Sequence, residues 1–166
     1  MKRFQKMMLA ALFSASVSVQ AAEVRGPVER GRYLVAVADC NGCHTAGFAE
    51  AGEAVPEAAR LTGLGVGFSG PWGVSYPANL RLSASTLSKR EWRVRARAGG
   101  LPPMPWAALK TMTDGDLNAI YAYLRALGPA GEAAPAALPP GAPIPTPHFV
   151  FVPQPPTRTV LGARTH

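Results

Sequence analysis

Residues 39–45 read DCNGCHT and contain both cysteines of the chain together with one of its three histidines. Cys40 and Cys43 are three positions apart, and His44 follows directly. At the end of a helix, thiols at this spacing face the same side, and the next residue can turn beneath the plane that they hold. This spacing predicts metal or redox chemistry, and the choice depends on where the chain resides and which other ligands it offers.

Four kinds of site fit this stretch. The first is a covalently attached haem, with thioethers from Cys40 and Cys43 and an iron ligand from His44. The second is a thioredoxin-like dithiol, which expects a βαβ setting that the sequence lacks. The third is zinc, for which His148 or His166 would supply a fourth ligand from the proline-rich tail. The fourth is a disulfide, whose closed loop is too short to stabilise the fold much. The motif favours haem.

The first residues predict export. Three basic residues within the first six precede a short apolar stretch at residues 7–19, and small residues around Ala21 resemble a signal-peptide cleavage site. The apolar stretch is short for a membrane span, so an uncleaved anchor is the less favoured alternative. We therefore expect residues 1–21 to be a signal peptide and the mature protein to be periplasmic.

The charge balance argues against nucleic-acid binding. Loss of the three basic residues of the signal peptide lowers the formal net charge from +7 to +4. The sequence has no long basic run and no basic-aromatic platform, so we expect no nucleic-acid partner.

A haem iron needs a second axial ligand, and beyond the signal peptide the chain contains two methionines. Met104 stands in PPMPW, where the prolines fix φ and keep Met104 itself out of the α region, so the sulfur sits on a stiff, extended segment. Met112 precedes the last predicted helix, and we expect it to fill space in the core. Methionine ligation is typical of electron carriers because it raises the reduction potential and leaves no open site for oxygen chemistry. We predict Met104 as the distal ligand, ahead of Met112 or His148.

Hydrophobic periodicity predicts three helices and no convincing strand. The first covers residues 28–39, and the second lies within residues 88–100, where it opens with an S-x-x-E capping box and stops at a glycine pair. The third covers residues 114–127, after Thr113 as N-cap. Gly31 in the first helix would let the first and third helices approach closely.

The remaining segments predict loops. Residues 65–70, GVGFSG, match G-x-G-x-x-G, but no strand pattern precedes them and Pro71 follows where a helix should open, so we predict no dinucleotide site. Residues 131–166 are rich in proline and lack periodicity, and we expect an extended or disordered tail.

The segments GRYLVAVADCNGCHT, GPWGVSYPANLR, LPPMPW and MTDGDLNAIYAYLRALGP together resemble class I c-type cytochromes. More narrowly, they are similar to the cytochrome subunits that accept electrons from exported bacterial dehydrogenases. The resemblance covers residues 28–130. It implies a small all-α domain at residues 22–130, in which the N- and C-terminal helices cross around one haem. It also implies that Cys40 and Cys43 are the covalent anchors of the haem, that His44 is its proximal ligand and that Met104 is its distal ligand.

The same resemblance implies that Tyr76, Asn79 and Arg81 lie near the haem edge or its propionates. The chain departs from the multi-haem subunits because it has a single C-x-x-C-H, so one haem is expected. The proline-rich tail is not part of the basic cytochrome pattern.

The expected function is one-electron transfer between a dehydrogenase and the respiratory chain or a terminal oxidase, with no substrate besides electrons. The alternatives are a haem enzyme or gas or redox sensor with a displaceable distal ligand, and a module without haem for interaction or metal storage. Membrane contact is expected only through a complex, if at all.

A row of basic residues predicts how the protein docks. Lys89, Arg93 and Arg97 recur at helical spacing on one face, and the only acid on that helix is Glu91. The row predicts an acidic docking face on the redox partner, and the alternative is a solvated helix surface.

Overall fold

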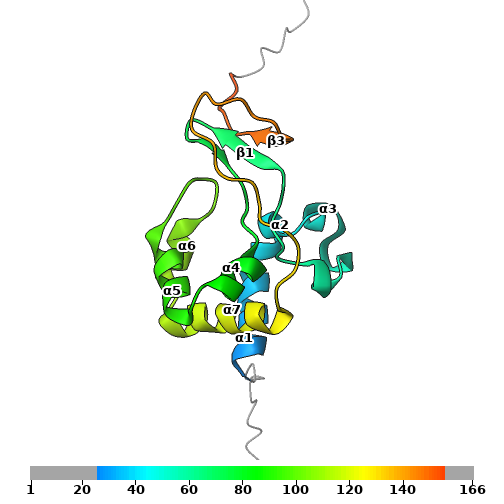
Figure 1. Ribbon diagram of the computed structural model, residues 1–166, viewed down its shortest axis with the longest axis vertical. Helices are drawn as coiled ribbons and strands as arrows, with labels where there is room; N and C mark the ends of the chain where they lie inside the picture. The colour runs from blue at the N-terminus through cyan, green and yellow to red at the C-terminus, as the bar shows by residue number, and fades with distance from the viewer. Residues whose placement is uncertain (1–25, 156–166) are drawn as a thin grey trace, which may run out of the picture.

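The computed structural model describes residues 26–155, which form a helical body and a small sheet that projects from it (Figure 1). No helix among these residues is long and apolar enough to cross a bilayer. The predicted signal peptide lies outside the described residues. The elements follow in the order α1 (Pro27–Val37), α2 (Cys40–His44), α3 (Phe48–Ala51), the 3-10 turns η1 (Gly52–Ala54) and η2 (Glu57–Ala59), β1 (Gly67–Gly70), β2 (Gly73–Ser75), α4 (Leu80–Thr86), α5 (Lys89–Ala98), α6 (Trp106–Thr111), α7 (Asp114–Leu127) and β3 (His148–Val150).

The three predicted helices are confirmed as α1, α5 and α7. Helix α5 opens with the predicted capping box, in which the Ser88 hydroxyl accepts from the Glu91 N–H and the Glu91 carboxylate accepts from the Ser88 N–H. Thr113 caps α7 in the same way. Helix α1 ends two residues earlier than predicted because Asp39 adopts a left-handed conformation with φ 50°, and the cysteine motif then forms the separate short helix α2.

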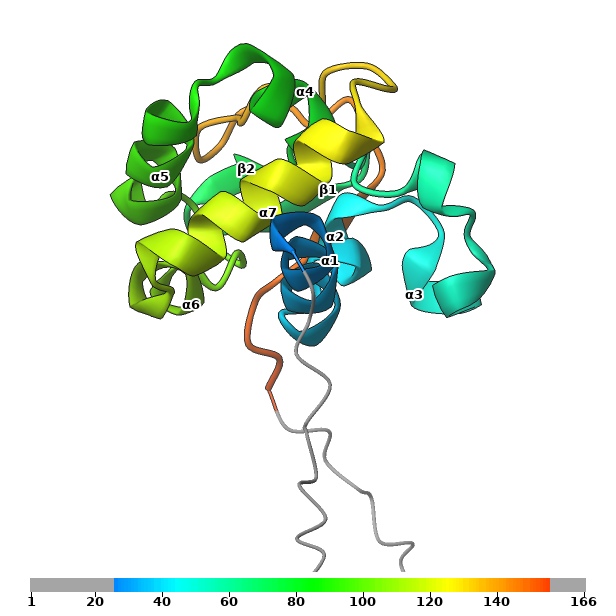
Figure 2. The ribbon, with the colours of Figure 1, turned by 90° about the horizontal axis from the view of Figure 1, so that it is seen from below.

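Helix α1 packs directly against α7. A Cβ atom on Gly31 would lie 2.0 Å from the carbonyl oxygen of Ala119, so only glycine permits this approach. Figure 2 shows α7 running across α1, which is seen nearly end on. The buried side chains around this contact form the core: Leu34, Val35, Leu61, Ala84, Trp92, Ala96, Leu117, Ala119, Ile120, Tyr123 and Leu124.

The expectation that no strand forms is wrong for three short segments. The sheet has the order β2-β1-β3, with β1 antiparallel to β2 and parallel to β3. Each strand has only three or four residues, which is too short for a period-two pattern to stand out in the sequence. The partner of β1 on one side also comes from a segment about 80 residues later, and such non-local pairing leaves no local signal.

The described part of the proline-rich segment is extended, and it packs against the domain. We call residues 133–152 the strap, and residues 62–79 together with the strap the sheet arm. The Leu138 N–H donates to the Val74 carbonyl, and the Val74 N–H donates to the Leu138 carbonyl, both at 2.9 Å. Gly73, with φ 92°, allows this approach, since a Cβ there would lie 2.1 Å from the Leu138 oxygen. Residues 156–166 of the predicted tail lie outside the described residues.

Candidate functional site

A cavity of about 270 Å³ lies where α2, the sheet and the loop before α6 meet. All four residues predicted to bind the cofactor line it, namely Cys40, Cys43, His44 and Met104. These residues come from two segments about 60 positions apart, so the fold brings together what the sequence separates. Most of the other lining side chains are apolar, and these include Trp92, Ala96 and Ile120 of the core.

The two thiols of α2 are free and protonated at neutral pH. Burial raises the pKa of Cys40 to about 11, with a further contribution from the nearby Asp39 carboxylate. The same two causes, in the same order, raise the pKa of Cys43. A redox-active dithiol requires the opposite shift, because the thiolate is its nucleophile. The environment of α2 therefore does not favour a thioredoxin-like function.

His44 is a neutral imidazole, and one of its ring nitrogens is hydrogen-bonded. Its side chain is buried, and its Nδ1–H donates to the Ala78 carbonyl oxygen at 2.8 Å. Burial lowers the pKa of His44, although the hydrogen bond to Ala78 opposes this shift. A backbone carbonyl on Nδ1 fixes the tautomer in which Nε2 carries a free lone pair, which is the usual arrangement of a histidine that binds a metal.

Met104 lines the cavity from the loop before α6, and hydrogen bonds from Trp106 hold this loop in place. The Trp106 N–H donates to the Met104 carbonyl at 2.9 Å, and the Trp106 indole N–H donates to the Leu101 carbonyl at 3.0 Å. Met112 does not line the cavity and packs against the hydrophobic core, as predicted. Of the two methionines, Met104 is therefore the one placed to meet a cofactor.

Of the three residues expected near the edge of the cofactor, only Tyr76 lines the cavity. Asn79 caps α4 by accepting from the Leu82 N–H, and its amide donates to the carbonyls of Ala130 and Glu132. Asn79 therefore fastens the start of the C-terminal extension to the domain.

Arg81 has a structural role that the sequence did not indicate. Its side chain is buried, and its guanidinium donates three hydrogen bonds of 2.6 Å to the carbonyls of Gly128, Leu127 and Ala58. Two of these carbonyls lie at the C-terminal end of α7, where helices leave carbonyl groups unpaired. The expectation that Arg81 lies at the cofactor is not supported, because Arg81 does not line the cavity.

Arg95 is a cavity residue that the sequence patterns did not predict. It is the only Lys, Arg, Asp or Glu among the described residues that line the cavity. Its guanidinium lies 4.8 Å from the centre of the Trp106 ring and donates to the Gly99 carbonyl at 3.0 Å. It follows the buried Trp92 of α5 by three residues, so the two side chains share one side of the helix, and this spacing is the signal that could have revealed it.

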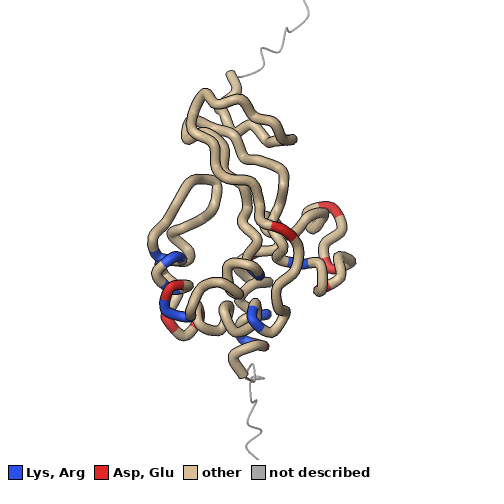
Figure 3. The backbone as a smooth tube through the Cα atoms, viewed as in Figure 1, with Lys and Arg blue, Asp and Glu red and all other residues tan. Residues whose placement is uncertain are grey.

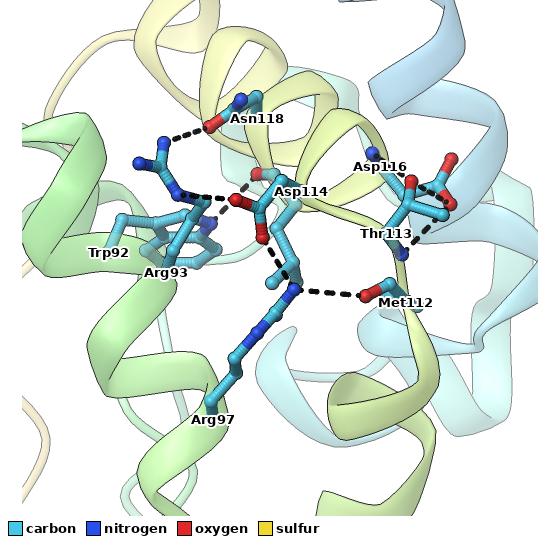
Figure 4. A network of polar contacts seen from close by, with 9 residues as sticks. Trp92, Arg93, Arg97, Met112, Thr113, Asp114, Asp116 and Asn118 are labelled. Carbon is cyan, nitrogen blue, oxygen red and sulfur yellow. Dashed lines mark hydrogen bonds and ion pairs between the residues drawn. The ribbon is translucent and has the colours of Figure 1, made fainter.

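The basic row on α5 is partly neutralised by an acid from another helix. The predicted docking face assumed that Glu91 was the only acid near the row, and this assumption is wrong. Asp114 of α7 pairs with Arg97 at 2.5 Å and with Arg93 at 3.4 Å, and Arg93 also donates to Asn118 (Figure 4). Figure 4 shows these side chains meeting between the two helices. The neutralising acid comes from another helix, so inspection of α5 alone could not find it.

No three side chains of His, Cys, Asp or Glu gather to hold a metal ion within residues 26–155. His148 lies in β3, is exposed, and has its Nδ1 3.0 Å from the Thr146 carbonyl. The other histidine weighed as a zinc ligand, His166, lies outside the described residues.

Comparison with known proteins identifies one family and two relatives. The model of the cytochrome c family matches residues 28–128. A nicotinate dehydrogenase subunit of Pseudomonas putida is 31% identical over 123 residues, which is 66% of this chain and 9% of that protein. The fructose dehydrogenase cytochrome subunit of Gluconobacter japonicus is 33% identical over 111 residues, which is 60% of this chain and 21% of that protein. The chain therefore matches a small part of each relative, and no solved structure gives a significant match.

Proposed function

Because the chain belongs to the cytochrome c family, we propose that it is a periplasmic one-electron carrier with a single haem c bound through Cys40 and Cys43. In this proposal, His44 and Met104 are the axial ligands, and α1 and α7 are the crossing pair of helices of a class I cytochrome. When bound, the haem supplies an iron that accepts and releases one electron, with a potential set by its ligands and surroundings.

The observation that carries this proposal is the convergence of four suitable groups on one apolar cavity. Two protonated thiols can form thioethers, and the His44 imidazole is neutral and oriented by Ala78. The Met104 sulfur is a soft ligand of the kind found in electron-carrying cytochromes. Arg95 provides a positive charge on the wall, which suits a cofactor with carboxylate groups.

The other cavity residues support electron transfer rather than substrate chemistry. The apolar walls keep water away from the cofactor, so little solvent has to reorganise when an electron moves. The hydrogen bond to Ala78 fixes the orientation of the His44 ring.

Covalent attachment is tested on the exported protein. Denaturing electrophoresis with a haem-peroxidase stain should colour the band, and Cys40→Ala together with Cys43→Ala should abolish the colour. A mature mass equal to that of the bare polypeptide would falsify the proposal.

The distal ligand is tested by two matched methionine variants. Met104→Ala should retain the covalent haem, lose the long-wavelength sulfur-to-iron absorption band, lower the reduction potential and let carbon monoxide bind. Met112→Ala removes the same side chain from the core and should leave the band in place. The opposite pattern would assign the ligand to Met112, and a wild-type protein that binds carbon monoxide readily would favour a haem enzyme or gas sensor.

We propose that the electron donor is a dehydrogenase, because both relatives are named as parts of dehydrogenases. The acceptor would be a component of the respiratory chain, such as a terminal oxidase. Within residues 26–155, Lys89 and Arg90 form no ion pair, and they could still face acidic groups of a partner.

A further inference from the structure

The strap lies beyond the region that matches the cytochrome c family, which ends at residue 128. Even so, one of its residues, Ala137, lines the cavity. A segment outside the family pattern therefore forms part of the wall around the proposed cofactor site.

The strap also supports the sheet side of the cavity from behind. Phe68 of β1 lines the cavity, and its ring stacks on Phe149 of the strap with centroids 5.6 Å apart. Tyr76, which also lines the cavity, has its hydroxyl 2.7 Å from the Thr146 hydroxyl of the strap. The two cavity residues are thus held from outside by strap residues that do not line the cavity themselves.

Two further contacts fasten the strap along the sheet. Leu138 and Val74 exchange a pair of backbone hydrogen bonds, and β3 pairs in parallel with β1 from His148 to Val150. The close approach at Gly73 shows that the backbone of the strap and that of β2 fit against each other without side chains between them. These contacts fasten the strap to the sheet at two places, at Leu138 and at residues 146–150.

We propose that the strap is a positioning element for the cofactor, which fixes Phe68 and Tyr76, closes the sheet side of the cavity to water and thereby raises the reduction potential. This inference rests on the proposed haem site. The physical reason is that water stabilises the oxidised iron, which carries the larger charge, so a drier cavity favours the reduced form.

The test loosens the strap in the full-length haem protein at two independent contacts. Leu138→Pro deletes the N–H that donates to Val74, and Thr146→Val removes the hydroxyl that meets Tyr76. Ala136→Pro is the matched control, because it adds the same ring two positions away where the N–H makes no hydrogen bond to a described residue. Amide hydrogen exchange at Val74 reports whether the strap has opened, and redox titration reports the potential.

We expect both variants to retain covalent haem and the methionine band, while the Val74 amide exchanges faster in Leu138→Pro. In both, the equilibrium constant for reduction should fall by about two- to tenfold, where tenfold is about 59 mV for one electron. The control should match the wild type. An opened strap with an unchanged potential would overturn the proposal, and so would unchanged exchange and potential in both variants. Failure of the wild type to carry haem would instead refute the proposed function, so the two failures are distinct.

Discussion

The helical body and the sheet arm are held together in different ways. The body contains all the ion pairs of the described residues, including those of Asp114 with Arg93 and Arg97, and most of the fully buried side chains. The sheet arm contains no Asp, Glu, Lys or Arg, and backbone hydrogen bonds and aromatic contacts join its two segments. Figure 3 shows the charged residues over the helices and the projecting sheet free of them.

This difference predicts different responses to change. The helix contact at Gly31 tolerates no added atom, whereas the exposed side chains of β3 can adjust. Phe149 and Val150 of β3 are 58% and 62% exposed, so their loss leaves no closed cavity. Salt should act on the body, because the arm carries no ion pair for it to screen.

The largest effect should come from one methyl group at the contact between α1 and α7. Gly31→Ala places a Cβ 2.0 Å from the Ala119 oxygen, so the helices must move apart, at a cost of about 2–3 kcal/mol. The same change at Gly115, where the nearest atom would be 3.5 Å away, should stabilise the protein by about 0.5–1 kcal/mol. Denaturant unfolding of the two variants measures both values, and equal effects would mean that the helix contact is not tight.

Salt should separate a change in the body from a change in the arm. Asp114→Asn removes an acid that is 64% exposed and pairs with two arginines, so we expect a loss of about 0.5–1 kcal/mol. Phe149→Ala removes an aromatic contact of similar worth, about 0.5–1.5 kcal/mol.

The loss in Asp114→Asn should shrink as salt rises toward about 1 M, because ions screen the pairs in the wild type. The loss in Phe149→Ala should not shrink. Unfolding curves at low and high salt give the comparison, and a salt-independent loss in both variants would show that the Asp114 pairs contribute little.

Alkaline pH should weaken the body through Tyr123. Burial raises the pKa of Tyr123 to about 12, and the hydrogen bond to Glu57 adds to the shift. The pKa of tyrosine in an unfolded chain is about 10. The folded state therefore disfavours the charged form of Tyr123, and this group should not change the stability below about pH 10. Stability should then fall between about pH 10 and 12.

Tyr123→Phe should remove this part of the alkaline decline, which is seen as the difference between the stability profiles of the two proteins. Titration of tyrosinate absorbance should show one fewer late-ionising group in the variant. A wild-type protein whose tyrosines all ionise near 10 would contradict the shift.

The smallest effect should come from Lys89 and Arg90 of α5, which form no ion pair within the described residues and do not line the cavity. Lys89→Gln with Arg90→Gln should slow reduction by the proposed dehydrogenase donor about two- to threefold at low ionic strength, since steering acts on association rate. The spectrum and potential should stay as in the wild type. An unchanged rate and salt slope, measured by stopped flow, would show that this end of α5 is a solvated surface.

Much of the fold and most of the candidate site could be predicted from local sequence patterns. The C-x-x-C-H motif, the caps at Ser88 and Thr113 and the prolines around Met104 each act within a few residues, so their geometry follows from the sequence alone. The lack of a side chain at Gly31 likewise marked the place where two helices approach.

Contacts between distant segments decided the rest. The sequence did not show that Asp114 neutralises Arg93 and Arg97, that Arg81 binds carbonyls at the end of α7, or that Arg95 reaches the cavity. The proline content predicted an extended strap. Its pairing with β1 could not be predicted, because it joins residues about 80 positions apart. Spacing and backbone preference are local properties that a sequence fixes by itself, whereas charge pairing and sheet pairing depend on which surfaces the folded chain brings together.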